Sequence, residues 1–175
     1  MIFPRRAASC VVAVAALSLT ACTSSEQAAA PPELPPLTFH PCDGFGPDAR
    51  AAAGIDGADI QRYEDREEPF QARPCSYRSD DPYSSVLISS NRIRLSKAEN
   101  DERYTLVQDT TVAGHRTLIT DFPGGLQCKA SVDFDPNVLE VMVGYKQGDI
   151  ETPEQACSLA LQVVEDLAPY FPDHL

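Results

Sequence analysis

The side chain with the clearest chemical assignment is the thiol of Cys22, which follows Leu19, Thr20 and Ala21 at the end of an apolar run. This order of residues is typical of the lipobox of bacterial lipoproteins. In such proteins the export signal is cut before the cysteine, and the thiol then carries fatty acyl chains such as palmitate. We therefore expect Cys22 to be the first residue of the mature chain and its lipid anchor.

The residues before Cys22 have the order of a signal peptide. A positive start with Arg5 and Arg6 precedes an apolar stretch over residues 7–19, which is shorter than the about 20 residues that a membrane-spanning helix needs. The neighbours of the arginine pair do not extend a twin-arginine motif, so general secretion is favoured. An ordinary signal peptide followed by a free cysteine is the alternative to a lipoprotein. Under both interpretations Cys10 leaves with residues 1–21.

Four cysteines remain after that cleavage: Cys42, Cys75, Cys128 and Cys157. An even number of thiols outside the cytoplasm indicates two disulfides. A zinc site is the alternative, but no two of these cysteines have the short spacing with which a pair of thiolates reaches one ion. Three pairings are open, of which Cys42 with Cys75 and Cys128 with Cys157 is the most local.

Few other residues suggest catalysis. The histidines are His40, His115 and His174, and none belongs to a hydrolase, metalloprotease or phosphate-binding motif. His115 follows Gly114 and is interpreted as a solvated turn residue. Since oxidised cysteines provide no nucleophile, we expect a protein that is not an enzyme and that has no catalytic residues, no metal and no cofactor.

Two acidic clusters, residues 64–68 and Asp80-Asp81, contain candidate oxygen ligands for calcium. Neither has the spaced acids and the central glycine of a calcium loop, and Arg66 interrupts the first. We interpret both clusters as solvated acidic surface.

The balance of charge restricts the class of partner. The chain has 14 basic and 26 acidic residues, a net charge of −12, and loss of residues 1–21 removes two arginines and no acid. An acidic surface repels nucleic acid and anionic lipid, which excludes nucleic-acid binding and electrostatic adsorption to a membrane. The lipid at Cys22 must then hold the protein on the extracytoplasmic face of the cell membrane.

Residues 22–38 are rich in proline, alanine and serine. Proline pairs favour extended polyproline geometry, so this segment is expected to be a tether. Residues 39–175 suit a single domain. A helix is expected over residues 47–54, and a short helix from Ser96 within the charged segment 92–103. Strands are expected from residue 75 and over residues 83–90, 104–107 and 116–120. A polar turn region is expected between the last two strands.

Residues 127–134 alternate strictly between two faces, which is typical of a strand buried on one side. Cys128, Ala130, Val132 and Phe134 face inward, and Gln127, Lys129, Ser131 and Asp133 face outward. After a turn at 135–137, residues 138–145 form a second such strand, with Glu140 on its outer side. The outer face of this hairpin is expected to be wet.

The strongest element is a C-terminal helix. Thr152 and Gln155 form a capping box, Pro153 takes the first helical position, and an apolar stripe runs on to Phe171. Cys157 lies beside that stripe, where it can reach Cys128 on the inner face of the sheet. The predicted fold class is α+β: an antiparallel sheet packed on a long C-terminal helix, with a short N-terminal helix and two disulfides.

The chain resembles the actinobacterial lipoproteins of domain of unknown function 3558. The likeness rests on His40-Pro41-Cys42 before an alanine-rich helix, Cys75-Ser76-Tyr77, Cys128 in an alternating strand, and Ala156-Cys157 at the last helix. It departs from the family at His40, where Asp is usual, and at Tyr77, where Trp is usual. The resemblance implies an exported, disulfide-bonded α+β domain and no established activity.

Two classes of function remain. The first is a non-enzymatic interaction or accessory module with a protein partner in the cell envelope. The second is a carrier or sensor that holds a small apolar ligand in an enclosed cavity. The outer face with Lys129 and Glu140 is the expected docking surface, and residues 92–103 are the next candidate.

Overall fold

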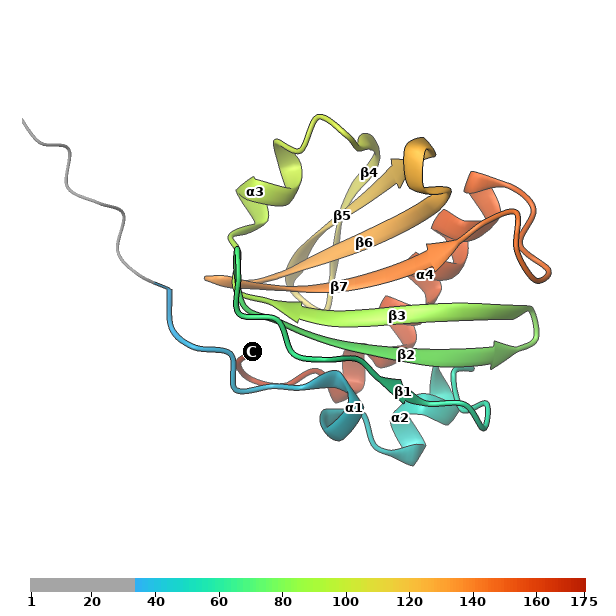
Figure 1. Ribbon diagram of the computed structural model, residues 1–175, viewed down its shortest axis with the longest axis horizontal. Helices are drawn as coiled ribbons and strands as arrows, with labels where there is room; N and C mark the ends of the chain where they lie inside the picture. The colour runs from blue at the N-terminus through green and yellow to red at the C-terminus, as the bar shows by residue number, and fades with distance from the viewer. Residues whose placement is uncertain (1–33) are drawn as a thin grey trace, which may run out of the picture. The chain divides into compact units, whose positions relative to one another are not determined.

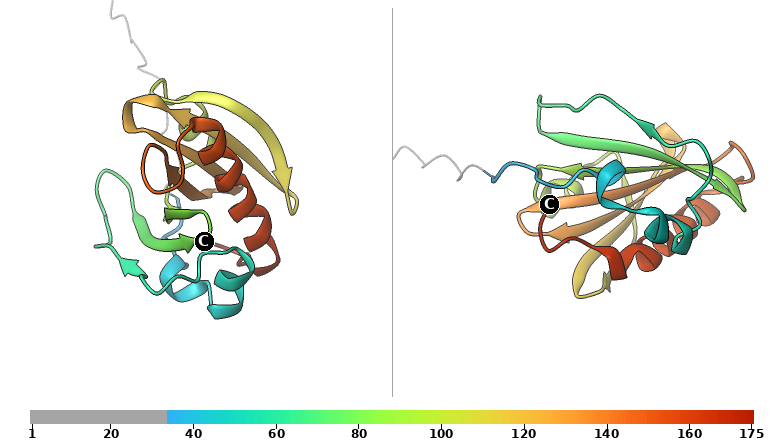
Figure 2. Two further views of the ribbon diagram at one scale, coloured as in Figure 1. Left: turned by 90° about the vertical axis from the view of Figure 1, so that its right-hand side faces the viewer. Right: turned by 90° about the horizontal axis from the view of Figure 1, so that it is seen from below.

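The computed structural model describes residues 34–175, so the expected signal peptide, Cys22 and most of the expected tether lie outside the described residues. The described chain forms a seven-stranded antiparallel sheet with a long C-terminal helix, α4, across one face (Figures 1 and 2). The helices are α1 (Pro41–Gly44), α2 (Pro47–Ala52), α3 (Leu95–Glu99) and α4 (Pro153–Leu167), with 3-10 turns at Pro123–Gly125 and Ala168–Tyr170. The strands are β1 (Gln61–Arg62), β2 (Ala72–Asp80), β3 (Tyr83–Asn91), β4 (Thr105–Val112), β5 (His115–Phe122), β6 (Gln127–Phe134) and β7 (Asn137–Gly144).

Three hairpins build the sheet, whose strand order is β1-β2-β3-β7-β6-β5-β4. Each hairpin joins neighbours in sequence, and the pairing of β3 with β7 brings the first hairpin against the other two. β1 and β4 therefore lie at the two edges (Figure 1). The registers of β6 and β7 match the alternation in the sequence, since Cys128 lies opposite Val143 and Ala130 opposite Val141.

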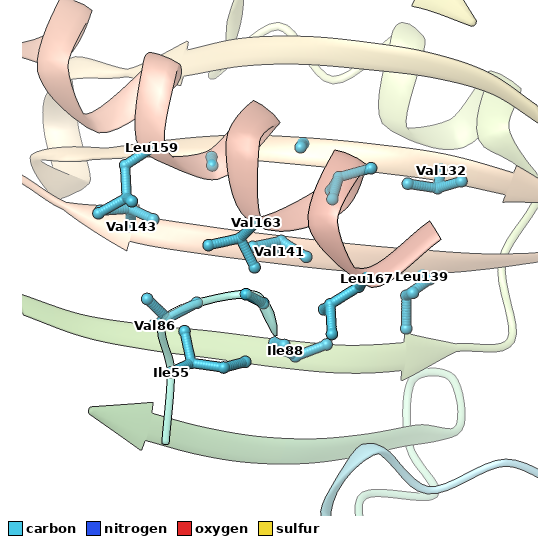
Figure 3. Close-up of a cluster of buried hydrophobic side chains, with 14 of the residues drawn as sticks. Ile55, Val86, Ile88, Val132, Leu139, Val141, Val143, Leu159, Val163 and Leu167 are labelled. Atoms are coloured by element: carbon cyan, nitrogen blue, oxygen red, sulfur yellow. The ribbon is translucent and has the colours of Figure 1, made fainter. Parts of the chain in front are cut away.

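Helix α4 begins as the sequence predicts and covers the inner face of the sheet. Thr152 accepts a hydrogen bond from the backbone N–H of Gln155, whose side chain returns to the cap, so the capping box is confirmed. Figure 3 shows side chains of α4 packed against β7 and β3, with Ile55 closing one side. The labelled contacts join Leu159, Val163 and Leu167 to Leu139, Val141, Val143, Val86 and Ile88.

Both disulfides have the most local pairing. Cys42 bonds Cys75 with 5.4 Å between their Cα atoms, which joins α1 to β2. Cys128 bonds Cys157 with 5.0 Å between Cα atoms, which joins β6 to the start of α4. Each bridge ties a helix to the inner face of the sheet.

One expected turn is a strand instead. Residues 108–112 belong to β4, which extends to Val112 and turns at Ala113 and Gly114, both with positive φ (49° and 87°). His115 opens β5 and is half-buried, so its interpretation as a solvated turn residue is wrong. The sheet is longer on this side than predicted, and strand outweighs helix in the described domain.

Candidate functional site

The outer face of the sheet, expected to be wet, is buried at its centre. Lys129 is 5% exposed and Glu140 is 8% exposed, and Ser131 between them is fully buried. Gln127 and Asp133, nearer the strand ends, are half-buried. The prediction of a solvated docking surface at Lys129 and Glu140 is therefore wrong, although the strand register behind it is correct.

Lys129 and Glu140 form an ion pair inside a polar network. Lys129 Nζ lies 2.9 Å from Glu140 Oε1, and the Tyr104 ring lies 4.0 Å from the ammonium group on another side. Asn91 Nδ2 donates to Glu140 Oε2 at 2.8 Å, and Ser131 Oγ donates to Oε1 at 3.4 Å. Each charged group thus has several partners, as burial requires.

The covering segment, residues 92–104, lies over this network and includes α3. Leu95 and Ala98 of α3 are buried, and Leu95 packs with Leu118 and Val138 on the outer face of the sheet. Val138 and Leu118 could have indicated this cover from the sequence, because an apolar residue on an otherwise polar sheet face must be shielded from water by another segment. Residues 92–103, the next docking candidate, thus cover the first candidate surface, and docking at these residues stays a prediction.

The ion pair does not have the geometry of a binding site. Charge reversal at both positions would be harmless on an exposed surface, where such pairs contribute about 0–1 kcal/mol. At 2.9 Å and almost without solvent, the pair is part of the protein's interior. Its hydrogen-bond partners come from β3 and β6, and Tyr104 of the covering segment contacts the ammonium group.

His40 has a structural role as the cap of α1. Its Nδ1 accepts a hydrogen bond from the backbone N–H of Cys42 at 3.2 Å, and Nε2 lies 3.2 Å from Asp65 Oδ1. Burial lowers the pKa of this imidazole, with a further contribution from Arg62 and an opposing one from Asp65. A neutral His40 accepts through Nδ1 as an aspartate would at a helix cap.

His115 and His174, the other two histidines, do not meet His40 or each other at a common site. His115 Nδ1 lies 2.7 Å from the carbonyl oxygen of Asp133, and its ring stacks on Phe134 with 4.3 Å between centroids. His174 is exposed near the C-terminus. Within residues 34–175, no group of three or more His, Cys, Asp or Glu side chains is placed to hold a metal ion.

The first acidic cluster is partly neutralised by Arg73. Its guanidinium lies 3.4 Å from Asp65 and 2.9 Å from Glu67. Asp80, the last residue of β2, and Asp81, in the β2–β3 turn, are both exposed. Neither arrangement brings carboxylates together around a shared centre in the described structure.

Two clefts of the described surface have polar linings. One of about 240 Å³ lies between α3 and the β6–β7 turn and is lined by Arg94, Glu99, Arg116, Asp133 and Asp135 among others. The second, of about 270 Å³, is lined by Leu34, Arg92 and residues 67–71. Charged side chains line both, which does not suit a small apolar ligand.

The most exposed of the large apolar side chains in the described domain lie on the edge strand β4. Leu106 is 57% exposed and Val107 is 55% exposed, and a β-bulge separates Leu106 from Gln108 in the pairing with β5. Residues 105–109 are all exposed. Of the sheet's two edges, β1 has two residues and β4 has eight, so β4 is the longer free edge of the described domain. The sequence did not indicate this surface, because an edge strand without a buried face has no alternation to detect.

Among residues 34–175, no helix is both long and apolar enough to cross a membrane. The fold and the site define a disulfide-bonded domain in which an antiparallel sheet packs on one long helix and a second, polar layer is closed by the covering segment.

The sequence matches the family described as protein of unknown function (DUF3558) over residues 7–170, and the chain belongs to that family. No curated protein and no solved structure matches the chain. At one of the two departures from the family pattern, Tyr77 is fully buried and its hydroxyl donates to the carbonyl oxygen of Pro41 at 2.7 Å, which lets tyrosine bind α1 to the sheet.

Proposed function

We propose that this protein is an exported lipoprotein, anchored through Cys22 to the extracytoplasmic face of the cell membrane, and that it acts there as a non-enzymatic interaction module. The Leu-Thr-Ala-Cys sequence, whose cysteine is the first residue of the expected mature chain, supports the anchor. Two disulfides support an oxidising compartment, because such bridges are rare in the cytoplasm.

The observation that carries the interaction function is the exposed edge strand. Leu106 and Val107 present apolar side chains on a strand edge, which soluble proteins usually shorten, charge or cover. The two clefts described above have linings rich in charged side chains, which does not support the carrier function.

Site-specific photocrosslinking in the native membrane tests this function. A photoreactive residue at Leu106 is expected to give a discrete crosslinked species. The matched control is Tyr63, which is 44% exposed close to β1 at the opposite edge of the sheet, and it should not give that species. Equal labelling from both positions, or none from either, would contradict an interaction surface at β4.

A further inference from the structure

The β4–β5 hairpin leaves a defined set of backbone groups free along β4. Val112 pairs with His115 across a two-residue turn, and in such a hairpin the flanking pair exchanges both hydrogen bonds. The bonding alternates from there, so Thr111 and Asp109 direct their N–H and C=O groups away from β5. Thr111 and Asp109 are exposed, and β4 ends the described sheet on this side (Figures 1 and 2). Free amides at this spacing bind an extended backbone.

The side chains beside this edge add an acidic cluster. Arg116 Nη2 lies 2.8 Å from Glu99 Oε1 and 2.8 Å from Asp109 Oδ2, so one guanidinium forms ion pairs with two carboxylates. Hydrogen bonds from Arg116 lower the pKa of both carboxyls, which keeps them charged.

This cluster opens into the cleft of about 240 Å³. Asp133 and Asp135 line that cleft together with Glu99, against Arg94 and Arg116, so carboxylates outnumber guanidinium groups there. A basic side chain from a neighbouring strand fits this surface.

The same outer face has an apolar position further along β4. Leu106 pairs with Thr120 and Asp109 with Leu118, and these two partners are two residues apart on β5, so Leu106 and Asp109 project on one side of the sheet. A strand that lies beside β4 would therefore meet an apolar and an acidic side chain at successive positions of one face.

We propose that an extended segment of a partner protein, with basic and apolar side chains on one face, adds to the sheet as a further strand beside β4. This inference rests on the interaction function proposed above and names the partner's chemistry. Main-chain hydrogen bonds to Asp109 and Thr111 would hold the segment, and its basic residue would reach Glu99 and Asp109.

The partner is a different protein rather than a second copy of this chain. Two copies would each bring a strongly negative charge, −12 for the whole chain, and antiparallel pairing of β4 with itself in the register that sets Asp109 opposite Asp109 would bring the two carboxylates close together. Like charges across a strand pair are destabilising. A basic segment faces no such repulsion.

A synthetic peptide in which Lys-Thr-Val-Thr repeats tests the inference, because lysine and valine then share one face of a strand. Binding of the labelled peptide to the full-length protein in detergent is measured by fluorescence anisotropy. Two control peptides have the same sequence but are N-methylated on one or the other alternate set of residues. Strand addition is expected to abolish binding for one control and to retain it for the other, because only one edge of the peptide faces β4.

Protein variants locate the site. Thr111→Pro removes an N–H that faces away from β5 and is expected to weaken binding about tenfold. Thr111→Val keeps that N–H and should bind as the natural protein does. Asp109→Lys leaves the backbone intact and should also weaken the lysine-containing peptide, which keeps the test valid if Thr111→Pro does not fold.

The inference is overturned if both methylated peptides bind equally, if Thr111→Pro and Thr111→Val behave alike in folded protein, or if sedimentation shows a dimer that Asp109→Lys alters. Peptide binding that fails while crosslinking from Leu106 persists would reject strand addition and leave the interaction function standing. Peptide binding without crosslinking in the membrane would support the strand site and reject the proposed partner contact in the cell.

Discussion

At the scale of single residues, the Lys129–Glu140 pair shows how a polar face becomes interior. Its carboxylate has the ammonium group, an amide and a hydroxyl as partners, and the Tyr104 ring lies 4.0 Å from the ammonium group. Moving an ion pair out of water costs several kcal/mol per charge, and attraction repays this only with such additional bonds. Removal of one member is therefore more harmful than removal of both.

We expect Lys129→Met to destabilise the protein by about 3–5 kcal/mol, because Glu140 would remain buried without its cation. The double change Lys129→Met with Glu140→Gln should recover most of that loss, since glutamine keeps partners for Asn91 and Ser131. Urea unfolding followed by circular dichroism measures both free energies. Lys97→Met, at an exposed position of α3, is the matched control and should change stability by less than about 0.5 kcal/mol. Equal destabilisation by the single and double variants would contradict the pair's role.

At the scale of elements, the sequence identified those with regular patterns. The capping box was sufficient to place the start of α4, and the alternation was sufficient to predict β6. Both elements have one face that is more buried than the other. Residues 108–112 were mistaken for a turn region because Asp109, Thr110 and Thr111 are polar on both faces of an edge strand. The cover over Lys129 was missed because α3 has five residues and buries only Leu95 and Ala98. Tertiary contact decided both segments, and the pattern within each segment does not show it; for the cover, the signal lay in Leu118 and Val138 of the sheet.

The bridge between β6 and α4 gives a prediction at this scale. Replacement of both Cys128 and Cys157 by alanine is expected to lower the free energy of unfolding by about 2–4 kcal/mol, because the unfolded chain loses a cross-link across 29 residues. Denaturant unfolding of the variant and the natural protein measures this difference. Peptide mapping without reduction should recover a linked peptide that contains both cysteines. A peptide linking Cys128 to Cys42 would contradict the pairing.

At the scale of the whole molecule, charge and attachment determine how the protein meets other molecules. With 26 acidic against 14 basic residues, it gains nothing from an anionic membrane surface, so the proposed membrane location requires the proposed covalent anchor. The acidic surface also favours basic partners over copies of itself, which agrees with the chemistry proposed for β4.

Cys22→Ala is expected to abolish lipidation and to release the protein from membranes. Labelling with a fatty-acid analogue, followed by separation of membrane and soluble fractions, measures both effects. Ser24→Ala, close by in the same segment, serves as the control and should remain labelled and attached. A Cys22→Ala protein that still takes up label and sediments with membranes would disprove the anchor.

The bridge between Cys42 and Cys75 has a mechanical consequence for a protein that is held at one end and bound at the other. If a partner pulls at β4 while lipid holds Cys22, the load enters the domain through the N-terminal segment. Peeling of that segment stops at Cys42, because a covalent bond passes the force to β2. β2 is hydrogen-bonded to β3 from Ala72 to Asp80, and β3 to β7 in turn, so many bonds bear the force together. In the proposed arrangement, the domain would therefore bear tension between a membrane and a bound protein without unravelling from its attached end.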